Sequence, residues 1–480
     1  MSGKPGGTSW SAPDQVRVPS RDDPVVAAAS ESMGGPLGRY AAPLARGWRY
    51  YAAVLAGVSA IPSALSVLLR SHCIEQGWSS PDQFWHACFS DLPATYRDAG
   101  LSAGVGAWLT GAADAPHPTQ PPLTAFVMTL LGSLVPSGSG SSPDDQLRFY
   151  FGLWAVLAAV LLALVTWWTA GSVRRFPIRA AHVALSPVVV LTLMISPDIV
   201  GVALLAAAIY AWTRERVVLT GILLGLAISA RSYPVLVLAA LLFLCLRAGR
   251  LGVWARVAGI AAVTFGGIML VIGVLNPAAA VAAYRGWADL GAGFGSPWLL
   301  PQLVLGGATI PGGVVTALAV AGWVAALVVG ALFALSRNRR PGLAEVSLVM
   351  IGIVMLTGKS MPVQSALWLV PLVALVGLEW RDHLIWAACE ALHFEAVWLY
   401  LAGTSVANRG LPAGWYAFFL LLRLAGVAWL VGRTWRLATA RSVVYDEDGA
   451  VADEVLGEQE SDPLAGPLHE APDDLVVRFS

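Results

Sequence analysis

Apolar residues in this chain are grouped in long runs separated by short polar segments. A helix crosses the apolar core of a bilayer with about 20 such residues. We therefore predict an all-α polytopic membrane protein of about twelve transmembrane helices. The candidate spans cover residues 50–69, 149–170, 180–197, 199–213, 217–230, 233–246, 256–275, 313–335, 343–358, 361–378, 384–402 and 414–432.

Several of these spans are short, and one apolar run does not fit the set. The segment 122–136 is followed by a polar stretch, so we expect a re-entrant or interfacial helix there. The spans 217–230 and 233–246 meet at Ala-Arg-Ser-Tyr-Pro, where Pro234 breaks the helix. Broken helices at membrane depth need protein or a water-filled cavity around them.

Composition excludes a soluble enzyme. Apolar and aromatic residues make up 57% of the 480 residues, and charged residues make up 12%. Soluble domains carry about 25% charged residues, so a water-facing globule of this size would lack polar surface. The net charge is zero and the charges are segregated, which gives no basis for nucleic-acid binding.

Polar arms flank the apolar region. Residues 1–48 are rich in Gly, Pro, Ser and Arg, and they lack the apolar core of a cleavable signal peptide. Residues 438–480 are acidic and have no apolar period. We expect a disordered cytoplasmic arm at 1–48, one transmembrane domain at 49–437 and a disordered cytoplasmic tail at 438–480.

The arginines set an orientation. If 122–136 does not cross, every cationic cluster falls on the same side as the N-terminus, which the positive-inside rule assigns to the cytoplasm. Both termini are then cytoplasmic, in the plasma membrane, and two long loops at 70–121 and 276–312 lie outside. Long loops in a compact protein are usually functional. The clusters are Arg39/Arg46/Arg49, Arg174/Arg175/Arg179, Arg214/Arg216, Arg247/Arg250/Arg256, Arg337/Arg339/Arg340, Arg381 and Arg433/Arg436/Arg441.

Few cations remain on the outer side. Arg231 and Lys359 stand at the outer ends of spans, beside prolines. They could clamp a phosphate, since Arg offers a bidentate fork and Lys a point charge. They could equally be interfacial anchors for the helix ends.

Two outer carboxylates allow a catalytic or a structural interpretation. Asp91 precedes a predicted short helix, where it could take a proton from a hydroxyl acceptor or, with Ser90, simply cap the helix. Asp198 follows Ser196-Pro197 between two spans, where it could bind a sugar or cap the next helix.

Other ionisable residues point to structure. Cys73 and Cys88 share the first outer loop, where a disulfide is expected and two free thiols are the alternative. His117 lies in a proline-rich turn and is interpreted as a surface residue. No group of residues has metal-ligand spacing, so we predict no metal site and no cofactor. Glu390 and Arg423 lie within spans, where a buried ion pair is expected.

The order of the outer-face motifs resembles the actinobacterial integral membrane proteins of glycosyltransferase family 87. The motifs extend over about 300 residues, although no single one is decisive. They are Cys-aromatic-Ser-Asp at 88–91, Pro-Pro-Leu-Thr at 121–124, Leu-Ser-Pro before Asp198, Ala-cation-x-Tyr-Pro at 230–234 and Gln-x-x-Leu-Trp-Leu-x-Pro-Leu at 364–372.

This resemblance implies a GT-C fold and a mannosyltransferase-type activity. The donor would be a polyprenyl-phosphate sugar, the acceptor an envelope glycolipid or glycan, and the mechanism inverting and metal-independent. Asp91 matches the catalytic base of the group. Arg231, Tyr233 and Lys359 would bind the lipid-linked phosphate, and Gln364 and Asp198 would line the site.

Three motifs depart from the family pattern. Thr-Gln-Pro at 119–121 stands for Glu-Tyr-Pro, Ser-Pro-Asp at 196–198 for Asn-Trp-Asp, and Pro-Val-Gln-Ser at 362–365 for Ser-Pro-Gln-Tyr. One expected carboxylate is absent, so either the acceptor differs or the chain is a divergent, non-catalytic relative. A multi-pass transporter or lipid flippase is a further alternative, since twelve spans with broken helices suit it equally. No repeat between the two halves supports it.

Overall fold

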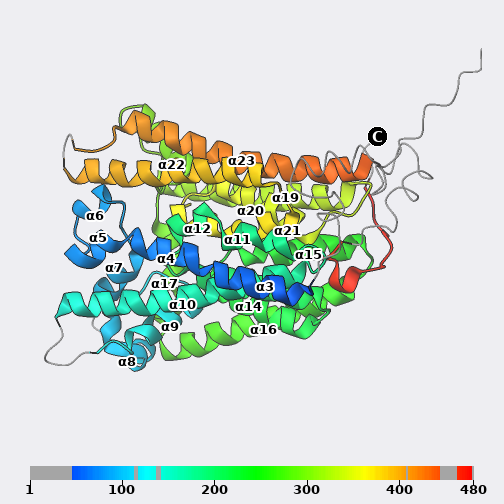
Figure 1. Cartoon of the computed structure of the whole chain (residues 1–480), viewed down its shortest axis with the longest axis horizontal. Coiled ribbons are helices and arrows are strands. Elements are labelled where there is room, and N and C mark those ends of the chain that lie inside the picture. The colour runs from blue at the N-terminus through cyan, green and yellow to red at the C-terminus, as the bar shows by residue number, and fades with distance from the viewer. Residues whose placement is uncertain (1–45, 113–116, 137–141, 407–408, 444–461, 478–480) are drawn as a thin grey trace, which may run out of the picture. The chain divides into compact units, whose positions relative to one another are not determined.

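A computed structural model of the chain describes residues 46–112, 117–136, 142–406, 409–443 and 462–477. Nearly all of these belong to one compact unit, which begins at Trp48. Every regular element in the described part is a helix, as the sequence predicts (Figure 1). Most of the predicted arm at 1–48 lies outside the described residues.

Six helical segments in the described part are long and apolar enough to cross a membrane. Each coincides with one of the longer predicted spans. The first is formed by α3 and α4 together, and the other five are single helices. They are α3 (Trp48–Val58) with α4 (Ala60–Leu68), α10 (Pro143–Ser172), α16 (Leu251–Leu275), α19 (Gly312–Ser336), α22 (Trp380–Ser405) and α23 (Ala413–Val443).

The other predicted spans are shorter helices, and several of them begin at or beside a proline. A helix of 14 residues is about 21 Å long, against about 30 Å for the bilayer core. The re-entrant prediction at 122–136 corresponds to α9 (Pro122–Gly132). The others are η2 (Pro177–Ala180), α11 (Ala181–Ala184), α12 (Pro187–Thr192), α13 (Asp198–Thr213), α14 (Val217–Ala230), α15 (Pro234–Arg247), α20 (Leu343–Thr357), η4 (Val363–Trp368) and α21 (Val370–Val376).

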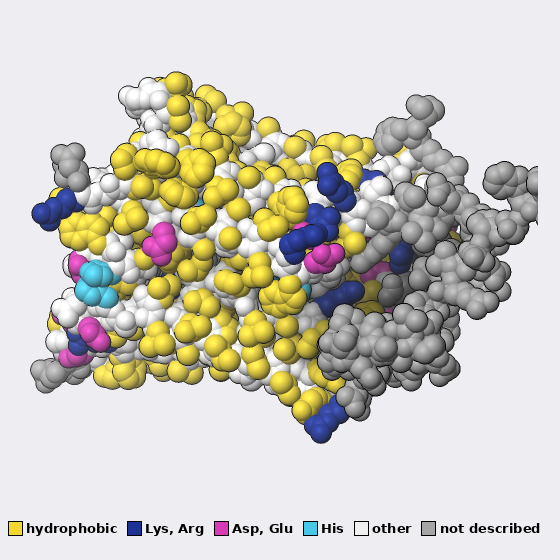
Figure 2. All heavy atoms as spheres, turned by 45° about the horizontal axis from the view of Figure 1, so that its top comes forward, with side chains coloured by type: hydrophobic (Ala, Val, Ile, Leu, Met, Phe, Trp, Pro, Cys, Tyr) yellow, Lys and Arg dark blue, Asp and Glu magenta, His cyan; other side chains and the backbone are white. Residues whose placement is uncertain are grey.

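The short helices form the interior of the helical unit. Most residues of α13 and α20 are buried, whereas α16 buries few of its side chains. Figure 2 shows a broad hydrophobic surface between the two ends of the molecule. Lipid cannot hydrogen-bond the free backbone N–H and C=O groups at a helix break. The breaks are therefore expected in the protein interior, and the long continuous helices at its surface.

The first long loop folds into a group of short helices at one end of the unit (left in Figure 1). Its Cys73 and Cys88 form a disulfide with Cα atoms 5.7 Å apart, which confirms the predicted pairing. The second long loop contains α17 (Pro277–Asp289), η3 (Pro297–Leu299) and α18 (Leu300–Val304). The helices of the first loop are α5 (Ser71–Gln76), α6 (Asp82–Trp85), α7 (Asp91–Asp98), η1 (Leu101–Ala103) and α8 (Gly104–Thr110).

The prediction that residues 438–480 are disordered is wrong for two segments. Residues 438–443 continue α23, and residues 462–477 lie against the helical unit. The remainder of the tail, 444–461 and 478–480, is outside the described residues.

The end of the chain is held by apolar and ionic contacts together. Leu464 and Leu468 are buried in the main core. Asp473 accepts hydrogen bonds from Arg247 (2.5 Å) and Arg340 (2.7 Å). Arg247 is fully buried, so the carboxylate of Asp473 supplies the counter-charge that a buried guanidinium needs. The acidic composition of residues 438–480 gave no indication that Leu464 and Leu468 would be buried in the core.

The predicted ion pair between Glu390 and Arg423 is present. Arg423 Nε lies 3.0 Å from Glu390 Oε2, and both side chains are 2% exposed. Arg423 also donates to the carbonyl of Pro362 and to Ser365 Oγ, each at 3.0 Å. The pair therefore braces the segment between α20 and α21 that contains Gln364.

Breaking this pair on one side is expected to destabilise the protein strongly. A buried charge left without its partner costs about 3–5 kcal/mol. Glu390→Gln and Arg423→Gln should each lower the thermal unfolding midpoint of the purified protein in detergent, and the swapped double variant should recover part of the loss. Glu395→Gln, at an exposed position of the same helix, is the control. Single variants as stable as this control would contradict the pairing.

Candidate active site

The carboxylate of Asp91 is held at the first residue of α7, close to the segment before α13. The side chain of Ser90 caps α7 by accepting from the amide of Leu92 (3.3 Å) and donates to the carbonyl of Met194 (2.7 Å). The amide of Asp91 donates to the carbonyl of Ile195 (2.7 Å). Ser90 thus performs the capping role, which leaves the carboxylate of Asp91 available for other contacts.

Asp198 and Arg231 form a buried ion pair between two helix ends. Asp198 begins α13, and Arg231 follows the last residue of α14. Arg231 Nε donates to Asp198 Oδ1 at 2.5 Å, and Nη2 contacts the same oxygen. Asp198 Oδ2 accepts from the indole of Trp368 (3.0 Å). The carboxylate therefore does more than begin a helix: it joins α13, the break after α14, and η4.

Arg231 also reaches the segment before α9. Its Nη1 donates to Gln120 Oε1 at 2.6 Å. Gln120 belongs to the Thr-Gln-Pro sequence that departs from the family pattern. An amide oxygen in this sequence thus accepts a hydrogen bond from the guanidinium.

A close approach positions the stem of Arg231. A methyl group placed on Gly201 of α13 would lie 2.8 Å from Arg231 Cγ. Any side chain at this position would push the arginine away, so Gly201 is required for the ion pair to form where it does.

Gln364 and Tyr233 complete the group around the ion pair. Gln364 Nε2 donates to Asp91 Oδ2 at 3.3 Å. The ring of Tyr233 stacks on Trp368, with centroids 4.6 Å apart and planes at 11°. The hydroxyl of Tyr233 is buried and has no hydrogen-bond partner among the described residues. A buried hydroxyl without a partner is unusual in a folded protein.

The environment of Asp91 makes it a base that works near neutral pH. Burial and the negative charge of Asp198 raise the pKa of Asp91 and Arg231 lowers it, which together place it at about 7. The guanidinium of Arg231 is hydrogen-bonded to Asp198, so it compensates the charge of Asp91 only in part. Such a carboxyl group exchanges a proton in the pH range where enzymes operate.

Lys359 lies apart from this group. Its ammonium donates to Thr316 Oγ1 (2.7 Å) and the carbonyl of Ala288 (3.1 Å), and it lies 4.2 Å from the ring centroid of Trp287. The side chain is 1% exposed. The structure therefore does not bring Lys359 into contact with Arg231, and the described contacts of its ammonium are with α17 and α19. A buried ammonium is also not an interfacial anchor.

Trp368 and Gln120 were missed as site residues in the sequence. Trp368 lies within the Gln-x-x-Leu-Trp-Leu motif, and Gln120 precedes the Pro-Pro turn. Both stand in motifs that the sequence singled out. Gln120 is hydrogen-bonded to Arg231 and Trp368 to Asp198, in each case across more than 100 residues. The motifs alone could not reveal these long-range partners.

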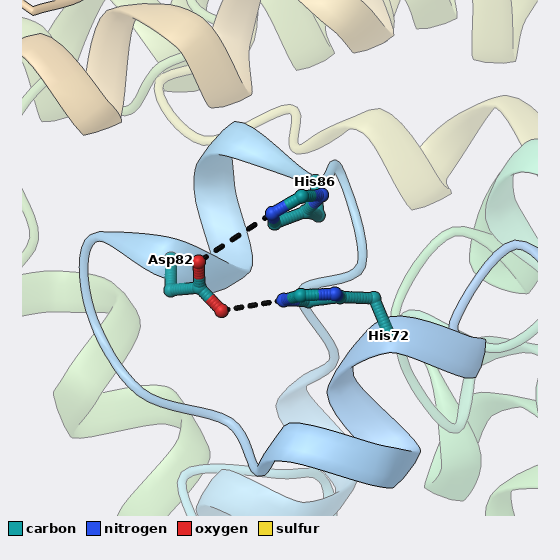
Figure 3. A group of neighbouring side chains, drawn as sticks. All are labelled: His72, Asp82 and His86. Atoms are coloured by element: carbon teal, nitrogen blue, oxygen red, sulfur yellow. Dashed lines mark hydrogen bonds and ion pairs between the residues drawn. The ribbon is translucent and has the colours of Figure 1, made fainter.

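The prediction of no metal site also overlooked one arrangement. The structure brings His72, Asp82 and His86 together on the first loop, with donor atoms within 4.8 Å of one another (Figure 3). Asp82 and His86 are four residues apart at the two ends of α6, a spacing that is visible in the sequence. His72 lies ten residues before Asp82 on α5, and only the fold of the loop brings it to the other two.

A cavity near the other end of the molecule takes no part in this site. It is lined by α23, the chain end and several arginines, including Arg175, Arg179, Arg339 and Arg340. None of its lining residues belongs to the group around Asp91.

Comparison with known proteins gives no family for this chain. No protein-family model, no curated protein and no solved structure matches it. The function must therefore be inferred from the site itself.

Proposed function

We propose that the protein is a membrane glycosyltransferase that moves a sugar, of the mannose type, from a polyprenyl-phosphate donor to a hydroxyl of an envelope glycolipid or glycan. The observation that carries this proposal is the pairing of a carboxylate of raised pKa, Asp91, with the adjacent Asp198–Arg231 ion pair. A base beside a guanidinium is what transfer from a sugar phosphate to a hydroxyl requires.

The chemistry would be a single inverting displacement. Asp91 takes the proton of the acceptor hydroxyl as its oxygen bonds to the anomeric carbon. The bond between that carbon and the phosphate oxygen breaks, and the polyprenyl phosphate leaves with the electron pair. Arg231, a charge-assisted donor, stabilises the leaving phosphate. The balance of bonds and charge needs no metal and no cofactor.

The other residues of the group have supporting roles in this proposal. Gln364 orients the carboxylate of Asp91. Trp368 fixes Asp198 and, with Tyr233, offers an aromatic wall beside the ion pair. Lys359 would act only on a part of the donor that extends toward α17 and α19.

The proposal includes an orientation in the plasma membrane. The six long segments and six short apolar ones would make twelve crossings of a GT-C-like fold, with both termini in the cytoplasm and the Asp91 group outside. In support, Lys and Arg side chains visible in Figure 2 are more numerous toward the end opposite the helices of the first loop. The disulfide between Cys73 and Cys88 also suits an oxidising, outer compartment.

Asp91→Asn is expected to abolish transfer with the protein still folded. Loss of a general base lowers the rate by about 10²- to 10⁴-fold. Purified protein is incubated with a labelled polyprenyl-phosphate sugar and envelope lipids, and the labelled product is measured. Asp98→Asn, at an exposed position of the same helix, is the control. Transfer retained in Asp91→Asn would remove this residue from the mechanism, and donor moved across vesicles without chemical change would favour a transporter.

The pH dependence of transfer should follow the ionisation of Asp91. A base must be deprotonated, and a pKa raised to about 7 keeps the carboxyl group protonated below that pH. The rate at limiting donor concentration is therefore expected to rise with pH up to about 7 and to level off above it. A rate that is constant from pH 5 to 8, with the protein folded throughout, would contradict the assignment.

Gly201→Ala is expected to impair transfer by displacing Arg231. A weakened hydrogen bond to a charged group costs about 1.5 kcal/mol, or roughly tenfold in kcat/KM. Gly259→Ala on α16 is the matched control, because nothing lies within 4 Å of the added methyl group. Equal kcat/KM values for the two variants would show that the position of Arg231 is unimportant.

A further inference from the structure

Two imidazole rings face one carboxylate in the first loop. His72 Nε2 lies 2.6 Å from Asp82 Oδ2, and His86 Nε2 lies 3.5 Å from Asp82 Oδ1 (Figure 3). All three side chains are partly or largely exposed, so an ion could reach them from solvent. We propose that His72, Asp82 and His86 bind one divalent transition-metal ion of the zinc type.

The donor set suits such an ion. Zinc takes imidazole nitrogen and carboxylate oxygen at about 2.0–2.2 Å, with four ligands in a tetrahedron. Ligand atoms in that geometry are about 3.3 Å apart, by arithmetic from those bond lengths. The two histidine nitrogens lie 2.6 Å and 3.5 Å from different oxygens of Asp82, and one donor atom from each of the three residues falls within 4.8 Å of the others. Small side-chain rotations would therefore place an ion among the three, with water at the fourth position.

The two rings also stack on each other. Their centroids are 3.6 Å apart and their planes differ by 24°. The stacking holds the rings side by side, with the Nε2 atom of each near the carboxylate of Asp82.

The disulfide holds the two histidine-bearing segments together. His72 directly precedes Cys73, and His86 lies two residues before Cys88. The bond between the two cysteines fixes the distance between these segments before any ion arrives. A site that is preorganised in this way loses little chain entropy on binding.

Each segment is also anchored to a long helix. Arg148 of α10 donates to the carbonyls of Ile74 (2.7 Å) and Glu75 (2.9 Å), just after His72. Trp85, beside His86, donates to the carbonyl of Arg409 (2.9 Å), just beyond α22. The ion would thus link a segment held by α10 to a segment held near α22.

The site would stabilise the loop rather than take part in sugar transfer. His86 precedes Asp91 by five residues, and Ser90 and Asp91 have their own contacts with residues 194 and 195. An ion bound at His86 would fix the start of the segment that delivers Asp91. The proposal stands independently of the glycosyltransferase proposal, because its test measures metal binding and not transfer.

The test uses full-length protein in detergent, purified without a polyhistidine tag and dialysed against metal-free buffer. Zinc is added and the excess is removed by a second dialysis, after which the bound zinc per chain and the shift of the thermal unfolding midpoint are measured. The wild type should retain one zinc ion per chain and unfold at higher temperature with zinc. His72→Asn and His86→Asn should each weaken binding at least tenfold and lose the shift.

His117→Asn is the matched control, since His117 lies in a different turn of the same loop. This variant should bind zinc as the wild type does. The visible absorption of bound Co²⁺ adds a readout on the wild type alone, and a four-coordinate spectrum is expected. The proposal is overturned if the wild type retains no zinc after dialysis. It is also overturned if all three histidine variants bind zinc equally, which would mean adventitious binding.

Discussion

The ion pair between Asp198 and Arg231 connects more segments than any other contact of the site. It joins the first turn of α13 to the break between α14 and α15, and its two partners reach Gln120 and Trp368. Neither residue could stay buried in an apolar helical unit without the other, because an unpaired charge there costs several kcal/mol. The breaks at Pro197 and Pro234 free the helix ends that carry this pair. The charge of Asp198 in turn raises the pKa of the neighbouring Asp91.

Two further arginines that lie outside the predicted cytoplasmic clusters brace the fold by donating to backbone carbonyls of distant segments. Arg70 donates to the carbonyl of Leu191, and Arg148 donates to two carbonyls of the first loop. Lys359 is enclosed by α17 and α19. Arg231 is therefore the cation whose contacts lie beside Asp91, which is why the proposed chemistry depends on it.

The sequence predicted the helical class, the longer spans, the disulfide and the Glu390–Arg423 pair, because each follows from apolar length, compartment or the cost of a buried charge. It also selected Asp91, Asp198, Arg231, Tyr233 and Gln364, which the structure gathers in one place. It could not separate Lys359 from them, because a position at a helix end does not reveal which neighbour the side chain faces. The docked chain end and the histidine cluster were missed for a related reason: both depend on contacts created by folding, not on local composition.

The proposed chemistry depends on Asp91, whose pKa burial and Asp198 raise to about 7. Infrared difference spectroscopy of the carboxyl groups tests this, with wild type and Asp91→Asn titrated from pH 4 to 9. A protonated carboxyl band should be lost with a midpoint near pH 7 in the wild type and be absent from the variant. A band assigned to Asp91 that is already lost below pH 5, as for an ordinary aspartate, would contradict it.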